Sequence, residues 1–175
     1  MQGIEYWHGQ QRDYEKYYLL GGDGASQNLK EEESGMGSPL GDLIKEYAEV
    51  NPAGDCIYYG LEKKVAWREF NDRVNRLSNG LSDLGIRKGD IGAVMFHNCP
   101  EFLESFYALQ KLGAIPSPLN YRFTPREIEY QTNQSDSIIF LTEEICLESV
   151  RKAKPNMPKV KNYICLLYTS PSPRD

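Results

Sequence analysis

The fold is decided by residues 67–97, which read WREFNDRVNRLSNGLSDLGIRKGDIGAVMFH. In the first half of this stretch, apolar side chains recur every three or four positions, as they do on one face of an α-helix. They are Phe70, Val74, Leu77, Leu81 and Leu84. Gly85 is a typical residue just beyond the C-terminus of a helix. The run IGAVMFH that follows is continuously apolar, which favours a strand covered by helices on both faces of its sheet.

The same alternation continues towards the C-terminus. Further helices are expected from Asn98, from Thr124 and over residues 143–154, with extended segments over residues 114–120, 137–142 and 159–164. This order predicts an α/β fold with a mostly parallel sheet, flanked by helices and joined by right-handed crossovers.

Upstream of the deciding stretch, residues 38–52 predict one more helix with Ser38 as its N-cap. The short runs CIYYG and KKVAW predict a hairpin. Two helices have an expected apolar inward face. The face consists of Leu40, Leu43, Ile44 and Tyr47 in the first helix, and of Phe102, Leu103, Phe106, Leu109 and Leu112 in the helix after Asn98.

The composition is that of an ordinary globular chain and narrows the range of partners. Of the 175 residues 26% are charged, and the net charge of −5 argues against a nucleic-acid partner. No apolar run approaches the roughly 18 residues that a membrane-spanning helix needs, and no signal peptide is visible. The four cysteines form no C-x-x-C pair. Neither a metal site nor a disulfide framework is therefore expected, and a cytoplasmic location fits best.

Three regions are expected along the chain. Residues 1–37 are rich in Gly, Gln, Glu and Tyr. We interpret them as a poorly ordered extension with a short helix around residues 13–20. Residues 38–164 carry the α/β pattern. The ending CLLYTSPSPRD matches the translation of a transposase-type sequencing-library adapter, so residues 165–175 are interpreted as a non-native tail.

Residues 38–164 resemble the start of the adenylate-forming (AMP-binding) ligases, a superfamily that includes acyl-CoA synthetases, adenylation domains of peptide synthetases, and luciferases. Four motifs carry the resemblance in the expected order. They are AWREF at 66–70, LGIRKGD at 84–90, NCPEF at 98–102 and LGAIPSPLNYR at 112–122. The last motif and the FTPREIEY that follows it are most similar to fatty-acyl and related CoA ligases. The resemblance implies an N-terminal fragment of the large domain of such an enzyme.

The resemblance also implies a two-step reaction. A carboxylic acid attacks the α-phosphate of ATP with Mg²⁺ present, and the acyl group of the resulting adenylate passes to the thiol of CoA. The family needs a Ser/Thr/Gly-rich phosphate loop closed by Lys-Gly, an aromatic-acidic segment for adenine and Mg²⁺, an Asp on the ribose and a mobile Lys. None of these occurs in the 175 residues. We therefore assign no catalytic and no metal-binding residue, and expect the chain by itself to be inactive. Two alternatives stay open: an adenylation domain with another acceptor, and a non-catalytic α/β interaction module.

Three side chains are candidates for contact with a ligand. In some CoA-forming members of the superfamily, a basic residue just before Leu-Gly-Ala approaches the nucleotide phosphate of CoA, and Lys111 has that position here. Arg122, after the Leu-Asn crossover, is a second basic candidate. A solvated surface charge is the competing interpretation of both. His97 ends a predicted strand, where α/β proteins often bind ligands; packing at the entry to a helix is the alternative role.

Overall fold

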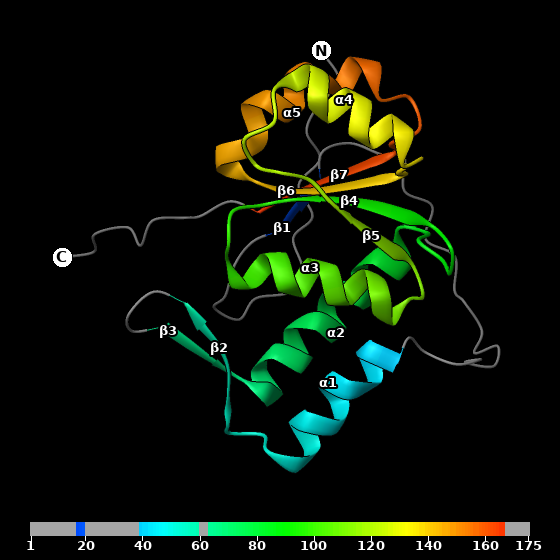
Figure 1. Ribbon diagram of the computed structural model, residues 1–175. Coiled ribbons are helices and arrows are strands. Elements are labelled where there is room, and N and C mark those ends of the chain that lie inside the picture. The colour runs from blue at the N-terminus through cyan, green and yellow to red at the C-terminus, as the bar shows by residue number, and fades with distance from the viewer. Residues whose placement is uncertain (1–16, 20–38, 60–62, 167–175) are drawn as a thin grey trace.

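The computed structural model describes residues 17–19, 39–59 and 63–166. It places a mainly parallel β-sheet between two layers of helices (Figure 1). Four parallel strands are ordered β7-β6-β4-β5. Their bounds are Ile91–Met95 (β4), Ile115–Pro118 (β5), Ile139–Glu143 (β6) and Asn162–Leu166 (β7). The α/β fold expected from the alternation of elements is confirmed.

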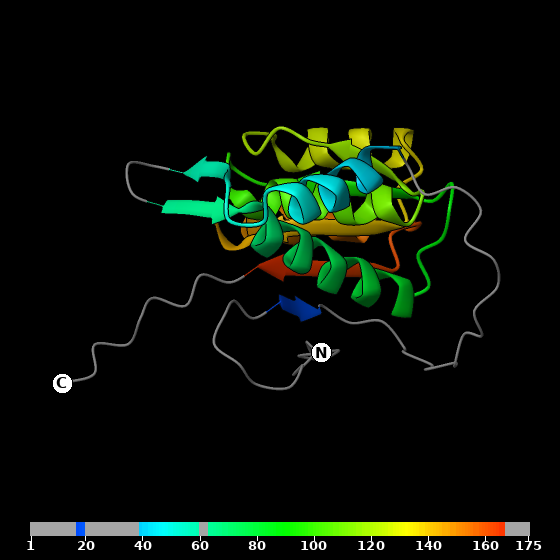
Figure 2. The ribbon, with the colours of Figure 1, turned by 90° about the horizontal axis from the view of Figure 1, so that it is seen from below.

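A fifth strand, β1 (Tyr17–Leu19), pairs antiparallel with the outer edge of β7 (Figure 2). The prediction of a helix around residues 13–20 is therefore wrong at these three residues. The edge of β7 presents unpaired backbone N–H and C=O groups, and an extended strand can pair with them whereas a helix cannot. Cys165 and Leu166, assigned to the tail, belong to β7. The rest of residues 1–37, and residues 167–175, lie outside the described residues, so their interpretation as extension and tail stays a prediction.

Two helical layers cover the sheet, with α1, α2 and α3 on one face and α4 and α5 on the other (Figure 1). The helices are α1 (Pro39–Val50), α2 (Trp67–Asp83), α3 (Pro100–Lys111), α4 (Pro125–Gln134) and α5 (Leu147–Ala153). Single 3₁₀ turns, η1 (Glu144–Cys146) and η2 (Lys154–Asn156), flank α5. The expected hairpin is formed by β2 (Asp55–Tyr59) and β3 (Lys63–Ala66). In the part of the chain that the structure describes, no helix combines the length and the apolar character that crossing a membrane requires.

Strand β4 separates the two halves of the apolar core. Val94 belongs to the half under α2 and α3, whereas Ala93 and Met95 belong to the half under α4 and α5. Gly92 lies where α3 crosses the strand. A Cβ atom there would lie 2.7 Å from Leu109 Cδ1 and 3.1 Å from Ile139 Cγ2. The missing side chain therefore lets α3 pack directly on the sheet.

Strand β5 forms the edge of the sheet beside β4. The backbone N–H of Ile115 donates to the carbonyl oxygen of Asp90 at 2.7 Å, and that of Leu119 donates to the carbonyl oxygen of Val94 at 2.9 Å. The backbone groups of successive strand residues point to opposite sides, so Pro116, one residue after Ile115, and Pro118 face away from β4.

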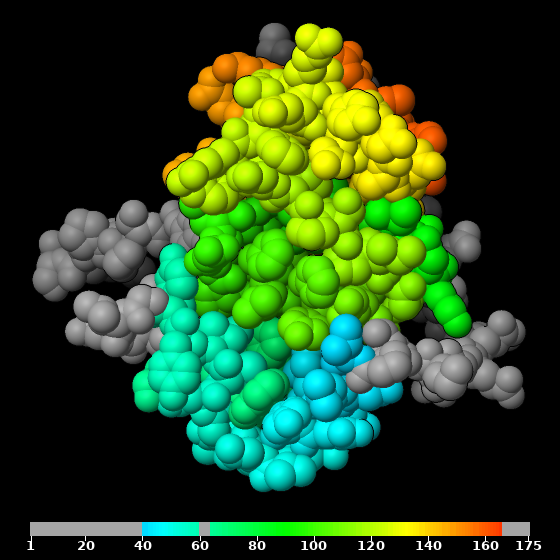
Figure 3. All heavy atoms as spheres, in the orientation of Figure 1, coloured from blue at the N-terminus to red at the C-terminus, as the bar shows by residue number. Residues whose placement is uncertain are grey.

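Helix α1 turns a different face inward from the one expected. Its buried residues are Gly41, Ile44 and Ala48. Leu40 and Leu43 are each 45% exposed. Helix α1 lies on the surface in the lower part of the molecule (Figure 3). Only Ile44 of the expected set is buried. Small residues explain the difference: a Cβ at Gly41 would lie 3.0 Å from Lys111 Cγ, so α1 approaches α3 through its glycine.

Helix α3 also differs from the apolar pattern. Leu109 is fully buried as expected, but the rest of the buried face includes Glu101, Glu104 and Ser105. Arg73 Nη1 donates to Glu104 Oε1 at 3.1 Å. A buried carboxylate is tolerated when it is paired in this way, and hydrophobic periodicity does not detect such a pair.

Lys111 lies where α1, α2 and α3 meet. Its Nζ donates to Asn71 Oδ1 at 2.8 Å and to Asn75 Oδ1 at 2.5 Å. Burial lowers the pKa of Lys111 below its ordinary value, and the negative charge of Asp42 opposes this effect. The ammonium group therefore joins α3 to α2 at some cost in desolvation.

Replacing Gly92 by Ala should destabilise the fold, because the added methyl group would press against Leu109 and Ile139. The expected loss is about 1–3 kcal/mol in the free energy of unfolding, the usual cost of overpacking. Gly80→Ala is the matched control. No atom lies within 4 Å of its added Cβ, and alanine within a helix should stabilise by about 0.5–1 kcal/mol. Urea unfolding of the three proteins measures both effects; equal midpoints would contradict the packing described for Gly92.

The stability that Lys111 contributes should depend on pH. The folded state lowers the pKa of Lys111, so the fold favours its neutral form. Charging Lys111 therefore costs stability at neutral pH, and this cost disappears as the pH rises through the lowered pKa towards the ordinary value of 10.5. Relative to Lys111→Met, the wild-type chain should gain stability over that window.

Urea midpoints of the wild type and of Lys111→Met, measured between pH 7 and pH 10.5, test this expectation. Lys161→Met is the control, because it makes the same change at an exposed lysine. A difference between the wild type and Lys111→Met that stays constant with pH, or that moves in the same way for Lys161→Met, would contradict it.

Candidate functional site

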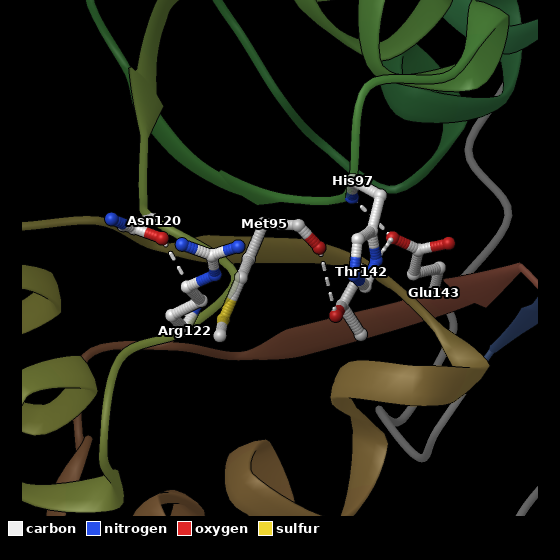
Figure 4. Close-up of polar contacts among 6 residues, drawn as sticks. All are labelled: Met95, His97, Asn120, Arg122, Thr142 and Glu143. Atoms are coloured by element: carbon white, nitrogen blue, oxygen red, sulfur yellow. Dashed lines mark hydrogen bonds and ion pairs between the residues drawn. The ribbon is translucent and has the colours of Figure 1, made fainter.

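The chain leaves the carboxyl ends of two neighbouring strands towards opposite faces of the sheet. Strand β4 continues into α3 on one face, and β6 continues through η1 into α5 on the other. Diverging connections of this kind create the crevice in which open α/β sheets usually bind ligands. His97, two residues beyond β4, and Glu143, the last residue of β6, lie together at this position (Figure 4).

Glu143 is a buried carboxylate held by His97. Its Oε1 accepts a hydrogen bond from the backbone N–H of His97 and lies 2.8 Å from His97 Nδ1. The side chain of Glu143 is 4% exposed, whereas that of His97 is 37% exposed. A buried carboxylate needs donors or a positive charge, and this pair supplies them while connecting the end of β4 to the end of β6.

The segment after β5 covers the imidazole on one side. The ring of Tyr121 lies against that of His97, with 3.8 Å between the ring centroids. The guanidinium of Arg122 lies 5.1 Å from the centroid of the Tyr121 ring, within the range of a cation–π contact. The backbone N–H of Arg122 donates to Asn120 Oδ1 at 3.0 Å. Arg122 is exposed, so its charge is presented at the carboxyl end of the sheet (Figure 4).

Cys146 brings a thiol to the same position from η1, and its side chain is buried. One ligand-type atom from each of His97, Glu143 and Cys146 lies within 4.8 Å of the other two; we call these residues the His-Glu-Cys cluster. Burial, and then the charge of Glu143, raises the pKa of the Cys146 thiol to about 11, while a hydrogen bond with Thr142 opposes the shift. Thr142 Oγ1 also donates to the carbonyl oxygen of Met95 at 3.0 Å. Without a further partner the thiol is therefore neutral at pH 7.

The three candidates from the sequence do not converge on one place. His97 and Arg122 both contact Tyr121 at the carboxyl end of the sheet. Lys111 is the last residue of α3, which begins near His97 and runs back along the sheet. Its amino group lies among the asparagines of α2 instead. The structure thus places Arg122 near His97 at the carboxyl end of the sheet, and Lys111 at the contact of three helices.

Two residues of the cluster were missed from the sequence. Glu143 directly follows the segment predicted as a strand, and a carboxylate at the carboxyl end of a parallel strand was the available signal. Cys146 gave no such signal, because its approach to His97 depends on β4 and β6 being neighbours. The search for a C-x-x-C pair detects only metal ligands that are close together in the sequence.

The described residues do not fit ATP or Mg²⁺ by themselves. Within residues 39–59 and 63–166, no Ser/Thr/Gly-rich loop closed by Lys-Gly follows a strand. Arg122 does suit the phosphate group of a nucleotide, because a guanidinium presents several donors to such an anion. The carboxyl end of the sheet therefore offers an anion contact and a small cluster of polar side chains, but no residues that would catalyse phosphoryl transfer.

Comparisons with known proteins identify the family. A family model described as AMP-binding enzyme matches residues 44–174. The crotonobetaine/carnitine–CoA ligase of Salmonella paratyphi A is 30% identical over 135 residues, which are 75% of this chain and 26% of the ligase. This chain thus spans about a quarter of the length of the curated relatives that it matches.

Solved structures agree with this match. A putative long-chain-fatty-acid–CoA ligase from Rhodopseudomonas palustris has a TM-score of 0.68 and 26% identity, over 75% of this chain and 33% of that one. A fatty acyl CoA synthetase from Mycobacterium tuberculosis has a TM-score of 0.65 and 25% identity, over 72% of this chain and 26% of that one. An anthranilate–CoA ligase bound to anthranoyl-AMP shares the fold at 21% identity, with a TM-score of 0.67 over 70% of this chain and 24% of that one. This chain belongs to the AMP-binding enzyme family, the adenylate-forming ligases, and is most similar to its acyl-CoA synthetases.

Proposed function

We propose that this chain supplies one α/β unit of an acyl-CoA synthetase, an enzyme that joins a carboxylic acid to CoA at the expense of ATP. The match over residues 44–174 to the AMP-binding family carries the proposal. Relatives named as CoA ligases favour CoA as the acceptor over the carrier protein of an adenylation domain. In this proposal ATP, Mg²⁺ and the carboxylic acid are bound with parts of an enzyme that these 175 residues do not contain.

The proposed contribution of the unit is structural, with one ligand contact. Its sheet would support the remainder of the large domain, and Arg122 would approach a phosphate group of CoA. Arg122 is favoured over Lys111 because Arg122 is exposed at the carboxyl end of the sheet, whereas the ammonium of Lys111 is bonded to Asn71 and Asn75. The thiols of Cys56 and Cys146 are free, which suits a reducing compartment such as the cytoplasm.

The proposal that ATP, Mg²⁺ and the carboxylic acid are bound outside these 175 residues can be tested by comparing this chain with the full product of the gene that encodes it. The full product should release AMP only when ATP, Mg²⁺, CoA and a carboxylic acid are all present. The 175-residue chain should release none, and ATP should leave its thermal midpoint unchanged. Adenylation of the acid followed by transfer to a carrier protein, with no use of CoA, would favour the adenylation-domain alternative. An upward thermal shift of the chain with ATP would contradict the proposal that its nucleotide site lies elsewhere.

The phosphate contact can be tested in the same active enzyme. Arg122→Ala should raise KM for CoA about tenfold, equivalent to about 1.4 kcal/mol of lost binding, with kcat and KM for ATP unchanged. Arg126→Ala is the control, because it removes a second exposed arginine at the start of the neighbouring helix α4. Lys111→Met tests the other candidate. An unchanged KM for CoA in Arg122→Ala, or an equal rise in Arg126→Ala, would show that Arg122 makes no specific contact.

A further inference from the structure

We infer that His97, Glu143 and Cys146 form a binding site for a divalent transition metal ion of the zinc type. The three residues offer an imidazole nitrogen, a carboxylate oxygen and a thiol sulfur that all lie within 4.8 Å of one another. They come from the loop after β4, the end of β6 and the turn η1. The ion would therefore connect three segments at the carboxyl end of the sheet.

The spacing of the donor atoms is close to that of a metal site. Bond lengths of about 2.0–2.3 Å in a tetrahedral zinc site place neighbouring ligand atoms about 3.3–3.8 Å apart. In the His-Glu-Cys cluster His97 Nδ1 and Glu143 Oε1 are 2.8 Å apart, and the most distant pair of ligand atoms is separated by no more than 4.8 Å. Side-chain movements of about 1 Å would thus complete the geometry. The backbone of the strands can stay as it is.

The chemistry of the donors selects the class of ion. Nitrogen, oxygen and sulfur together suit zinc and related borderline ions. Mg²⁺ prefers oxygen ligands only, so this set does not suit the magnesium that accompanies a nucleotide. Three protein ligands leave one tetrahedral position for water or another small donor, as in open zinc sites. The partial exposure of His97, 37% of its side chain, gives solvent access to the cluster.

The surroundings hold the donors in place. Glu143 is 4% exposed and is held by the backbone N–H of His97. The hydroxyl of Thr142, the residue before Glu143, donates to the carbonyl oxygen of Met95 at 3.0 Å and so ties the end of β6 to the end of β4. Tyr121 packs against the imidazole and limits its rotation. Hydrogen bonds around the ligands are a usual feature of metal sites, since they orient the donors before the ion arrives.

Cobalt titration of the full 175-residue chain tests the inference. Co²⁺ bound through Cys146 should give a cobalt–thiolate charge-transfer band in the near ultraviolet, which equimolar Zn²⁺ should abolish by displacement. Cys146→Ser should remove the band. Loss of an outer hydrogen-bond partner already costs about 10–100-fold in metal affinity, so His97→Ala and Glu143→Gln should each weaken binding at least tenfold. Far-ultraviolet circular dichroism of every variant verifies that its fold is intact.

Cys56→Ser is the matched control, because it removes a cysteine of β2 that lies outside the cluster. It should keep both the band and the affinity. A wild-type chain that gives no band overturns the inference, as does a band that survives Cys146→Ser. Equal affinities in the wild type and the folded His97→Ala variant would show binding by a thiol alone, and would also overturn it. The cobalt spectrum requires no ligase activity. A failure of the metal-site inference can therefore be distinguished from a failure of the proposed function.

Discussion

The close contact between α3 and strand β4 is the constraint on which the rest of the structure depends. Gly92 allows this contact, since any side chain there would collide with Leu109. Strand β4 pairs with both β5 and β6, so the helix that it supports lies over an interior strand of the sheet and not over its edge. Helices α1 and α2 then pack on α3, and the other face is left to α4 and α5.

The candidate site follows from this arrangement. Because β4 leads into α3 on one face while β6 leads towards α5 on the other, the chain diverges after the two strands, and His97 and Glu143 lie together at their carboxyl ends. Backbone order alone thus brings His97 next to Glu143 and Cys146. A chain with the same residues but another strand order would not join them.

The pattern of apolar residues was sufficient to predict the elements from α1 to β7, but it missed β1 and did not give every orientation. The stretch around β4 was clear because a continuously apolar strand between two amphipathic helices has few alternatives. The inward face expected for α1 was wrong, because α1 packs through Gly41, which has no side chain. On α3 most of the expected apolar residues do pack against the core, but the burial of Glu104, which Arg73 neutralises, was not expected. Neither reason is visible in hydrophobic periodicity. Of the candidate site, His97 and Arg122 could be found from their places after predicted strands. Cys146 required the order of the strands, which the sequence does not state.

The two prolines of β5 have a consequence for how this protein meets other polypeptides. Pro116 and Pro118 occupy the positions that face away from β4, and proline has no backbone N–H. The outer margin of β5 therefore lacks the donors that an incoming strand would need, which is one way in which natural sheets avoid edge-to-edge aggregation. The margin beyond β7 is occupied by β1. Strand addition is therefore disfavoured along β5, and further protein is expected to meet this side of the molecule through side chains, not through an extension of the sheet.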